Sequence, residues 1–168
     1  MNIFFLSYSA RRAAKYHCDK HVVKMILETC QMLYTAHWII TDGDSLTDCP
    51  FTPYKPAFKN HPCNVWLRES LSNYKWLCRL GIYLCKEFTH RYKKIHRCHP
   101  FIKWLRKNQP PISDIGLTPA AKAMPGIYKS DCPVKSYRKY YINDKSGFAT
   151  WKFTPIPYWY QLSSRLDK

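Results

Sequence analysis

The sequence predicts a mostly α-helical fold, a compact bundle around two long antiparallel helices with shorter helices toward the C-terminus. Two long segments repeat apolar residues every three or four positions, which is the spacing of one helix face. The alternation of apolar and polar residues that a large sheet requires is missing. A length of 168 residues, 46% of them hydrophobic, is typical of one domain with its own core. We therefore expect a single basic helical domain over 1–168.

The first long helix is predicted over 10–40, after a short buried strand or extended lead-in at residues 2–8. Ser9 is the expected N-cap, because its hydroxyl can accept a hydrogen bond from a backbone N–H of the first turn. The apolar stripe of this helix follows steps of four and three, and it consists of Ala14, Cys18, Val22, Met25, Thr29, Met32 and Ala36.

A Pro-rich connecting loop is predicted near 41–62, because its four prolines forbid a regular helix and its aspartates favour turns. The second long helix is predicted over 63–93. Asn60 or His61 is its expected cap, and Pro62 stands where a first-turn proline is tolerated. Gly81 lies on its apolar stripe and permits a close helix crossing.

Shorter helices are predicted over 100–107, over 119–124 after a Thr118 cap, and over 133–146 with Gly147 as the stop signal. The tail at 151–160 contains two prolines and is expected to be extended against the body.

The charge balance points to a polyanionic partner. Lys and Arg number 27 against 11 Asp and Glu, a net charge of +16. Aromatic residues make up 16% of the chain, and this mixture of rings and cations favours nucleic acid, DNA more than RNA. The eight cysteines are interpreted as reduced thiols, and neither a signal peptide nor a membrane-spanning stretch is recognised. The expected location is the host cytoplasm or nucleus, or the virion, and not the secretory route. No Gly-rich phosphate loop is found, and no cofactor is predicted.

Basic residues are concentrated on one face of the second long helix and in the segment that follows it. The face combines Arg68, Ser72, Lys75, Arg79, Tyr83, Lys86, His90 and Lys93, and it contains no acid. Ordinary solvated faces interleave Glu with Lys, so this stripe favours phosphate binding. The predicted nucleic-acid-binding residues are Arg68, Lys75, Arg79, Lys86, His90, Arg91, Lys93, Lys94, Arg97, Lys103, Arg106, Lys107, Arg138, Lys139 and Lys152.

A second polar face on the first long helix has enough chemistry for an active site. His17, His21, Lys24 and Glu28 follow one another at helical spacing. Two imidazoles and a carboxylate can cleave a phosphodiester or glycosidic bond. The commonplace interpretation is a polar helix face with a Lys–Glu pair one turn apart. The Glu that follows the first His in zinc proteases is missing, and no metal site is predicted.

Three segments resemble a family of small uncharacterised proteins of tailed phages and large DNA viruses. These segments are residues 16–25 (YHCDKHVVKM), residues 60–63 (NHPC) with Trp66 and 68–70, and Thr118-Pro119 through 123–125 with Tyr137-Arg138 and Tyr140-Tyr141. The resemblance covers nearly the whole chain. It implies a viral source and work on viral nucleic acid, but it supplies no activity, cofactor or catalytic residue.

Three hypotheses about function stay open. The leading one is a viral nucleic-acid-binding protein that binds duplex DNA without sequence preference, for genome packaging or escort. The alternative is an enzyme that acts on nucleic acid, of the nuclease or base-excision type, with the His17, His21, Lys24 and Glu28 face at its centre. The third, binding to anionic lipid or an acidic host protein, is disfavoured because no large apolar face accompanies the basic stripe.

Overall fold

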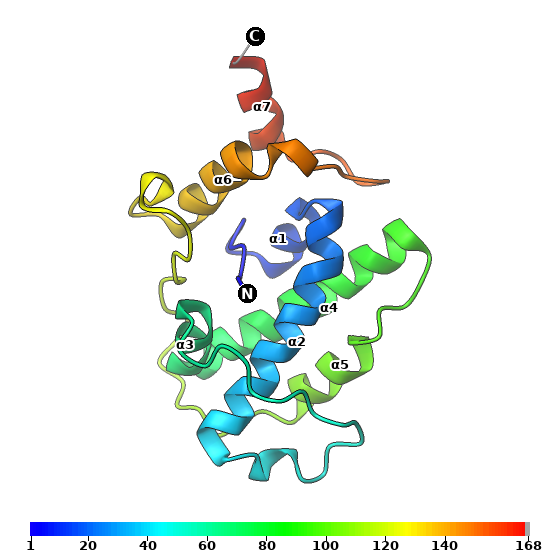
Figure 1. Cartoon of the computed structure of the whole chain (residues 1–168), viewed down its shortest axis with the longest axis vertical. Helices are drawn as coiled ribbons and strands as arrows, with labels where there is room; N and C mark the ends of the chain where they lie inside the picture. The colour runs from blue at the N-terminus through cyan, green and yellow to red at the C-terminus, as the bar shows by residue number, and fades with distance from the viewer. Residues whose placement is uncertain (167–168) are drawn as a thin grey trace.

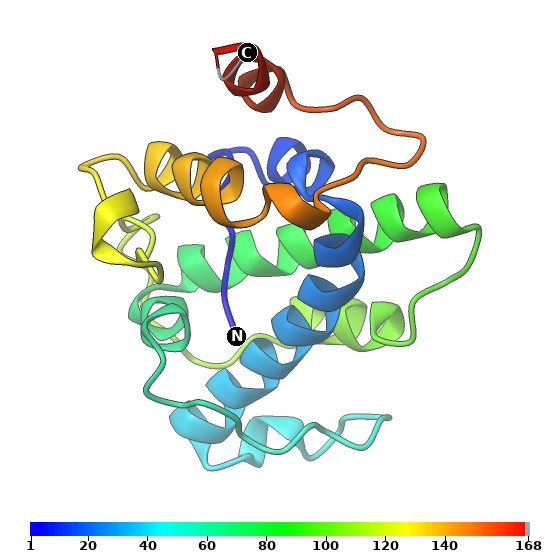
Figure 2. The ribbon, with the colours of Figure 1, turned by 45° about the horizontal axis from the view of Figure 1, so that its top comes forward.

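The computed structural model describes residues 1–166, and over this range the chain is all-helical with no β-strand. Helices α2 (Asp19–Thr41) and α4 (Leu71–Tyr92) cross at the centre of the molecule and run in opposite directions (Figures 1 and 2). The predicted fold class is therefore confirmed. The other helices are α1 (Ala10–Tyr16), α3 (Pro62–Glu69), α5 (His99–Lys107), α6 (Pro133–Asp144) and α7 (Tyr158–Leu166).

The crossing depends on Gly81 of α4, as its place on the apolar stripe predicted. A β-carbon at this position would lie 2.9 Å from the methyl carbon of Thr29 on α2 and 3.1 Å from Ile102 on α5. A glycine therefore lets three helices approach more closely than any side chain would allow. The buried core follows these contacts and continues under α1 and α3. None of the described helices is long and apolar enough to cross a membrane.

The first long helix is not continuous, which corrects the prediction of one helix over 10–40. The chain leaves helical geometry at His17 and Cys18, where ψ is 132° and 165°, between α1 and α2. Distant side chains take the backbone groups freed there: Arg91 donates to the carbonyl oxygens of Lys15 and His17, and the backbone N–H of Cys18 donates to the Tyr141 hydroxyl. Contacts between residues so far apart in the sequence cannot be detected from the local periodicity of apolar residues.

The second long helix is also interrupted, at Ser70, whose backbone is extended (φ −152°, ψ 142°). The Ser70 hydroxyl accepts a hydrogen bond from Ser72 N–H, and Asp114 accepts from the hydroxyls of both serines. Ser70 is thus the N-cap of a new helix, α4. The expected cap at the start of α3 is confirmed in His61, whose side chain accepts from Cys63 N–H, with Pro62 in the first turn.

The predicted helix over 119–124 is wrong. Tertiary hydrogen bonds hold this segment in an irregular path: Thr118 N–H donates to Asn73, and the Tyr137 hydroxyl donates to Ala121 C=O and accepts from Ala123 N–H. A local helix would have to give up these bonds. A short 3-10 turn, η2 (Gly126–Tyr128), follows instead.

The two ends of the chain agree in part with expectation. Residues 2–8 form the extended, buried lead-in and no strand, and Ser9 caps α1 by accepting a hydrogen bond from Arg12 N–H. The helix predicted over 133–146 is present as α6 and is followed by the 3-10 turn η3 (Ser146–Phe148). The tail has no regular helix as far as Pro157, but it turns at 152–154 and is therefore extended only in part. Helix α7 then begins, which the sequence analysis missed. In the 41–62 loop the regular structure is limited to the 3-10 turn η1 (Asp44–Leu46).

Candidate active site and nucleic-acid contacts

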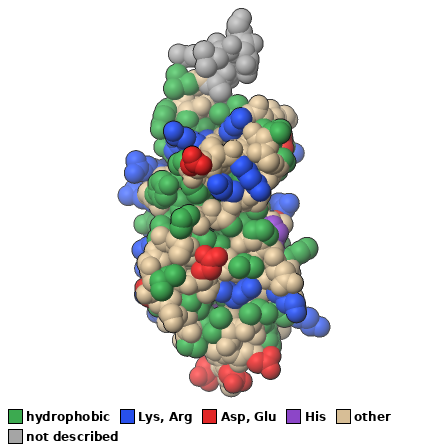
Figure 3. All heavy atoms as spheres, turned by 90° about the vertical axis from the view of Figure 1, so that its left-hand side faces the viewer, with side chains coloured by type: hydrophobic (Ala, Val, Ile, Leu, Met, Phe, Trp, Pro, Cys, Tyr) green, Lys and Arg blue, Asp and Glu red, His purple; other side chains and the backbone are tan. Residues whose placement is uncertain are grey.

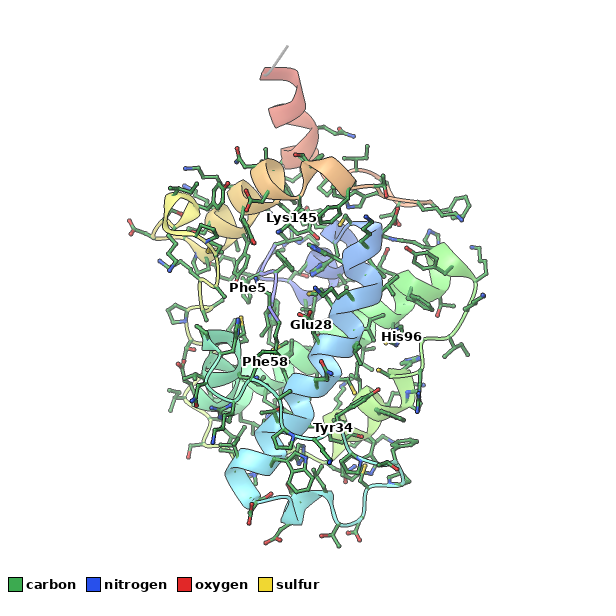
Figure 4. All side chains as sticks on the ribbon, viewed as in Figure 1. Phe5, Glu28, Tyr34, Phe58, His96 and Lys145 are labelled. Atoms are coloured by element: carbon green, nitrogen blue, oxygen red, sulfur yellow. The ribbon has the colours of Figure 1, made fainter. Side chains whose placement is uncertain are left out.

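A polar hollow of about 210 Å³ lies where the N-terminal segment, α2 and α6 meet. Glu28 projects from the middle of α2 toward the N-terminal segment, and Lys145 comes from the end of α6 (Figure 4). The hollow is lined by Met1, Asn2, Phe4, His21, Lys24, Met25, Glu28, Tyr140 and Lys145.

Glu28 is a buried carboxylate held among positive groups. Its residue is 7% exposed, and its Oε2 accepts a 2.8 Å hydrogen bond from the backbone N–H of Asn2. The α-amino nitrogen of Met1 lies 3.8 Å from Oε2, and the Lys24 ammonium lies 3.5 Å from Oε1. A buried charge is tolerated when it is paired and hydrogen-bonded. The hollow therefore offers a paired and hydrogen-bonded carboxylate with two amines beside it.

His21 lines the same hollow, about two helical turns before Glu28. Its Nδ1 lies 2.6 Å from the hydroxyl oxygen of Tyr141, and its ring stacks on Phe4 at 4.3 Å between centroids. Burial lowers the pKa of His21 to about 3, and the charges of His17, Lys145 and Lys24 add to the effect. The ring is therefore neutral at pH 7 and acts through hydrogen bonding, because it cannot form an ion pair with phosphate.

His17 does not lie with the other three predicted residues, because it stands in the break between α1 and α2. It is fully buried, its Nδ1 lies 2.7 Å from the carbonyl oxygen of Ala13, and its Nε2 has no hydrogen-bond partner within the described part of the chain. Burial lowers the pKa of His17 to about 4. Of the four residues on the predicted face, His21, Lys24 and Glu28 line the hollow together, whereas His17 is buried in the break between the helices.

The sequence analysis did not predict the other residues that line the hollow. Met1, Asn2 and Phe4 arrive on the extended lead-in, and Tyr140 and Lys145 arrive from α6, more than a hundred positions along the chain. Periodicity in α2 carries no information about such partners. Within the described residues, no group of three His, Cys, Asp or Glu side chains is arranged to hold a metal ion.

The basic stripe of α4 is joined by cations from two other helices. A hollow of about 520 Å³ combines Arg11 and Lys15 of α1 with Lys86 and His90 of α4. A second one of about 190 Å³ places Arg106 of α5 next to Lys75 and Arg79. The contributions of Arg11 and Lys15 were not predicted. Cations from several helices that meet on one surface are typical of a phosphate-binding surface.

Some of the residues predicted to bind nucleic acid have other partners. Arg91 corrects the prediction most clearly, because it is fully buried and forms ion pairs with Asp19 and Glu87. Arg68 lies on α3 and donates to Lys59 C=O, and Arg138 donates to Leu6 C=O. The exposed members of the set are Arg79, Lys86, His90, Lys93, Lys94, Arg97, Lys103, Arg106, Lys107, Lys139 and Lys152, with Lys75 half-buried.

The stripe and the Glu28 hollow face different ways. Gly81 contacts α2, and the stripe residues lie on the opposite side of α4 by helical spacing, so they point away from α2. On the face shown in Figure 3, acidic side chains are grouped most closely at the lower end of the molecule, and isolated ones lie higher up. The loop after α2, which carries the exposed Asp42, Asp44 and Asp48, turns at that end (Figure 1). This end is therefore the part least suited to a polyanion.

Two further hollows flank Phe51 of the connecting loop. One, of about 680 Å³, is lined by Trp104, Lys103, Arg106 and Lys107, and the other, of about 430 Å³, by Tyr54, Phe101, Lys55 and Arg97. Rings and cations together, without an acid, are the combination that contacts both bases and phosphates. The sequence analysis singled out Arg97, Lys103, Arg106 and Lys107. It did not single out Lys55 or the aromatic residues Phe51, Tyr54, Phe101 and Trp104.

Comparison with known proteins identifies a family. Residues 1–100, which include the lead-in, α2 and α4, match the family described as pyrimidine dimer DNA glycosylase. The match agrees with a DNA-related function and adds an activity that the resemblance noted in the sequence lacked. No curated protein and no solved structure matches the chain.

Proposed function

The chain belongs to the pyrimidine dimer DNA glycosylase family, and from this premise we propose that it cleaves the N-glycosidic bond of damaged pyrimidines in DNA, with Glu28 as the catalytic carboxylate. The observation that carries the proposal is the buried Glu28, which lines a polar hollow and is paired with two amines; Glu28 and both amines lie within the matched region. The family supports the enzyme alternative, of the base-excision type, better than the packaging hypothesis.

Cleavage of an N-glycosidic bond places positive charge on the sugar as the base leaves. A fixed carboxylate stabilises this charge, as it does in glycoside hydrolysis. Glu28 is suited to the task because the Asn2 N–H and the surrounding pairs hold its oxygens in place. The duplex must open or bend at the lesion for the sugar to reach such a hollow, and an already distorted pair is the least costly to open.

The attacking group is either water or one of the two amines beside Glu28. A neutral amine would form a bond to C1′ of the sugar while the C1′–N bond breaks and the base leaves with the electron pair. Opening of the sugar ring then converts the adduct into a Schiff base. Glu28 is placed to take the proton that the amine must lose. The candidates are the α-amino group of Met1 and the side chain of Lys24.

The other groups of the hollow have supporting roles. Lys24, 68% exposed at its side chain, and Lys145 stand at the rim, where they would meet the phosphates on either side of the extruded nucleotide. Neutral His21 would form a hydrogen bond to the base or sugar, and Tyr141 would orient its ring. Burial raises the pKa of Tyr141 well above its usual value, so its hydroxyl stays protonated and available to His21.

The test is cleavage of the N-glycosidic bond in a duplex oligonucleotide with one site-specific pyrimidine dimer. The cleaved base stays joined to its neighbour through the dimer, so cleavage is measured as an alkali-labile abasic site and not as free base. Glu28→Gln keeps the size of the side chain and an acceptor for Asn2 N–H, but it removes the charge. We expect a rate loss of roughly 100-fold or more, while Glu69→Gln, an exposed control, keeps full activity. A wild-type chain that leaves no abasic site at the dimer, or a fully active Glu28→Gln variant, would contradict the proposal.

Borohydride distinguishes an amine from water as the attacking group. It reduces a Schiff base to a permanent protein–DNA cross-link, whereas attack by water leaves no cross-link. A cross-link that survives in Lys24→Gln assigns the α-amino group, and one that disappears assigns Lys24. Active enzyme that never cross-links would show that water attacks.

A further inference from the structure

Two adjoining hollows on the connecting loop and α5 have no role in the proposed glycosylase reaction. Their volumes are about 680 and 430 Å³, and Phe51 lines both of them. Among the described residues they share no lining residue with the Glu28 hollow. Tyr34 of α2, whose ring lies 6.4 Å from that of Phe101 in the smaller hollow, is labelled nearer the lower end of α2 than Glu28 (Figure 4). The two hollows are therefore a separate feature of the surface.

Four aromatic rings form the apolar part of these hollows. The rings of Phe51 and Phe101 lie 4.5 Å apart between centroids, and Tyr54 lies 6.0 Å from Phe101. Trp104 follows Phe101 by three residues on α5, so both side chains lie on one face of that helix. All four rings are half-buried, and Tyr54, Phe101 and Trp104 pack against the core. Each ring is thus supported by the protein and still lines a hollow.

The loop that carries Phe51 and Tyr54 is fixed in place. The indole N–H of Trp38 on α2 donates to Tyr54 C=O at 2.9 Å, and the Tyr54 hydroxyl oxygen lies 3.8 Å from the sulfur of Cys98. A connection of this length with only one short turn of regular structure is uncommon in a compact domain unless it is functional. A ligand that binds to rings already held in position loses less affinity to the ordering of the site.

The charge around the rings is entirely positive. Five exposed cations line the two hollows: Lys55, Arg97, Lys103, Arg106 and Lys107. The segments 49–59 and 97–107 contain no acid. Arg106 also lines the hollow that contains Lys75 and Arg79, so the site continues into the basic stripe of α4. A row of cations beside aromatic rings matches a strand that carries both phosphates and bases.

We propose that these two hollows bind single-stranded DNA, with unpaired bases stacked on the rings and the five cations at the phosphates. Within a duplex each base is covered by its neighbours and presents only its edges in the grooves, whereas an unpaired base offers its flat face to a ring. Because Phe51 lines both hollows, consecutive bases of one strand can enter them. DNA is the expected strand because the family acts on DNA. The site goes beyond the proposed glycosylase function and does not depend on it.

The probe is a labelled oligothymidylate of about ten nucleotides, within the size range of known single-strand sites. A strand of equal length without bases keeps the phosphates and lacks the flat faces. Phe51→Leu keeps an apolar side chain but removes the ring, and Lys103→Gln combined with Lys107→Gln removes two exposed charges. Phe58→Leu is the matched control, because Phe58 stands on the same loop, is 70% exposed and lines neither hollow. Fluorescence anisotropy across a salt series gives the affinities.

We expect wild type to bind the oligothymidylate roughly 10-fold or more tightly than the strand without bases. Phe51→Leu should lose roughly 5-fold or more on the oligothymidylate and nothing on the strand without bases, because only the ring is removed. The double lysine variant should weaken binding to both strands alike and flatten the log–log salt dependence by roughly 0.7 for each lost phosphate contact. Phe58→Leu should match wild type on both strands.

Several outcomes would overturn the site. Equal affinity of wild type for the two strands would show that bases are not bound, and this comparison needs no variant. A Phe51→Leu variant that is folded by thermal denaturation and binds the oligothymidylate as wild type does would exclude these hollows. Tighter binding of an oligouridylate of equal length would assign the site to RNA instead. The probe contains no dimer, so a chain that leaves no abasic site in damaged duplex could still show this binding, and the two proposals fail separately.

Discussion

Replacement of Arg91 by methionine should destabilise the protein without weakening its binding to DNA. Arg91 is fully buried on α4, and its guanidinium donates to Asp19 at 3.0 Å, to Glu87 at 3.1 and 3.3 Å, and to the carbonyl oxygens of His17 at 2.9 Å and Lys15 at 3.2 Å. One side chain thus joins α4 to the junction of α1 and α2, where the backbone is not helical. Methionine fills the space of the aliphatic stem but leaves all these acceptors without the cation.

The expected loss of stability follows from the charges of Asp19 and Glu87, which stay buried when Arg91 is replaced. Removal of one partner of a buried ion pair costs about 3–5 kcal/mol, because the other charge stays buried. Asp19 keeps hydrogen bonds from Thr150 and Lys152, and Glu87 keeps one from Thr154, so the lower part of that range is expected. A destabilisation of about 3 kcal/mol corresponds to a fall of roughly 6–12 °C in Tm for a chain of this length.

Two measurements on the same variant test this reasoning. Urea denaturation gives the free energy of unfolding, and fluorescence anisotropy with a short duplex, at a temperature where the variant is fully folded, gives the DNA affinity. Lys86→Met on the exposed face of α4 is the control for stability, and it should change the unfolding free energy by about 0.5 kcal/mol or less. A fall in DNA affinity of Arg91→Met with an unchanged unfolding free energy would refute the structural role.

Two other predictions concern charge. Reversal of Lys145 at the hollow should remove the preference for dimer-containing over undamaged duplex. Reversal of Arg79, Lys86 and Lys93 on the stripe should instead weaken binding to all sequences alike and flatten the salt dependence, by roughly 0.9 in log–log slope for each phosphate that is no longer neutralised. Competition anisotropy across a salt series distinguishes the two effects, and a stripe reversal that leaves affinity unchanged would exclude that surface. The stability of the fold should also fall at acidic pH. Burial lowers the pKa values of His17, His21 and His37 from the usual 6.5 to about 4, 3 and 4, respectively. Below pH 6.5 the unfolded chain binds more protons than the folded one, so stability that is present above that pH is lost as the pH falls toward 4. The loss is up to about 2 kcal/mol for each histidine at pH 5. Thermal denaturation at pH 7, 6 and 5 measures this loss, and a Tm that does not change with pH would contradict it.

The amino-acid sequence by itself determined the helical class, the two long crossing helices and the polar group of His21, Lys24 and Glu28, because each depends on spacing within one helix. Periodicity of three and four is a local property, and so is the role of Gly81, whose missing side chain stands on an apolar stripe. The excess of cations likewise indicates a polyanionic partner without any knowledge of the fold. The family match to residues 1–100 makes that partner DNA and is the basis of the proposed glycosylase activity.

Tertiary structure alone decided where the helices break and what completes the site. The backbone groups at His17 and Cys18 are satisfied by Arg91 and Tyr141, and such distant partners stabilise a break that local pattern does not reveal. For the same reason Arg91 is buried and joins α4 to the junction of α1 and α2, although cations close to it in the sequence are exposed. Glu28 acquired its environment from Met1 and Asn2 on the lead-in and from Lys145 of α6. Burial and pairing depend on which segments meet in space, and folding brings those segments together only through contacts between residues far apart in the chain.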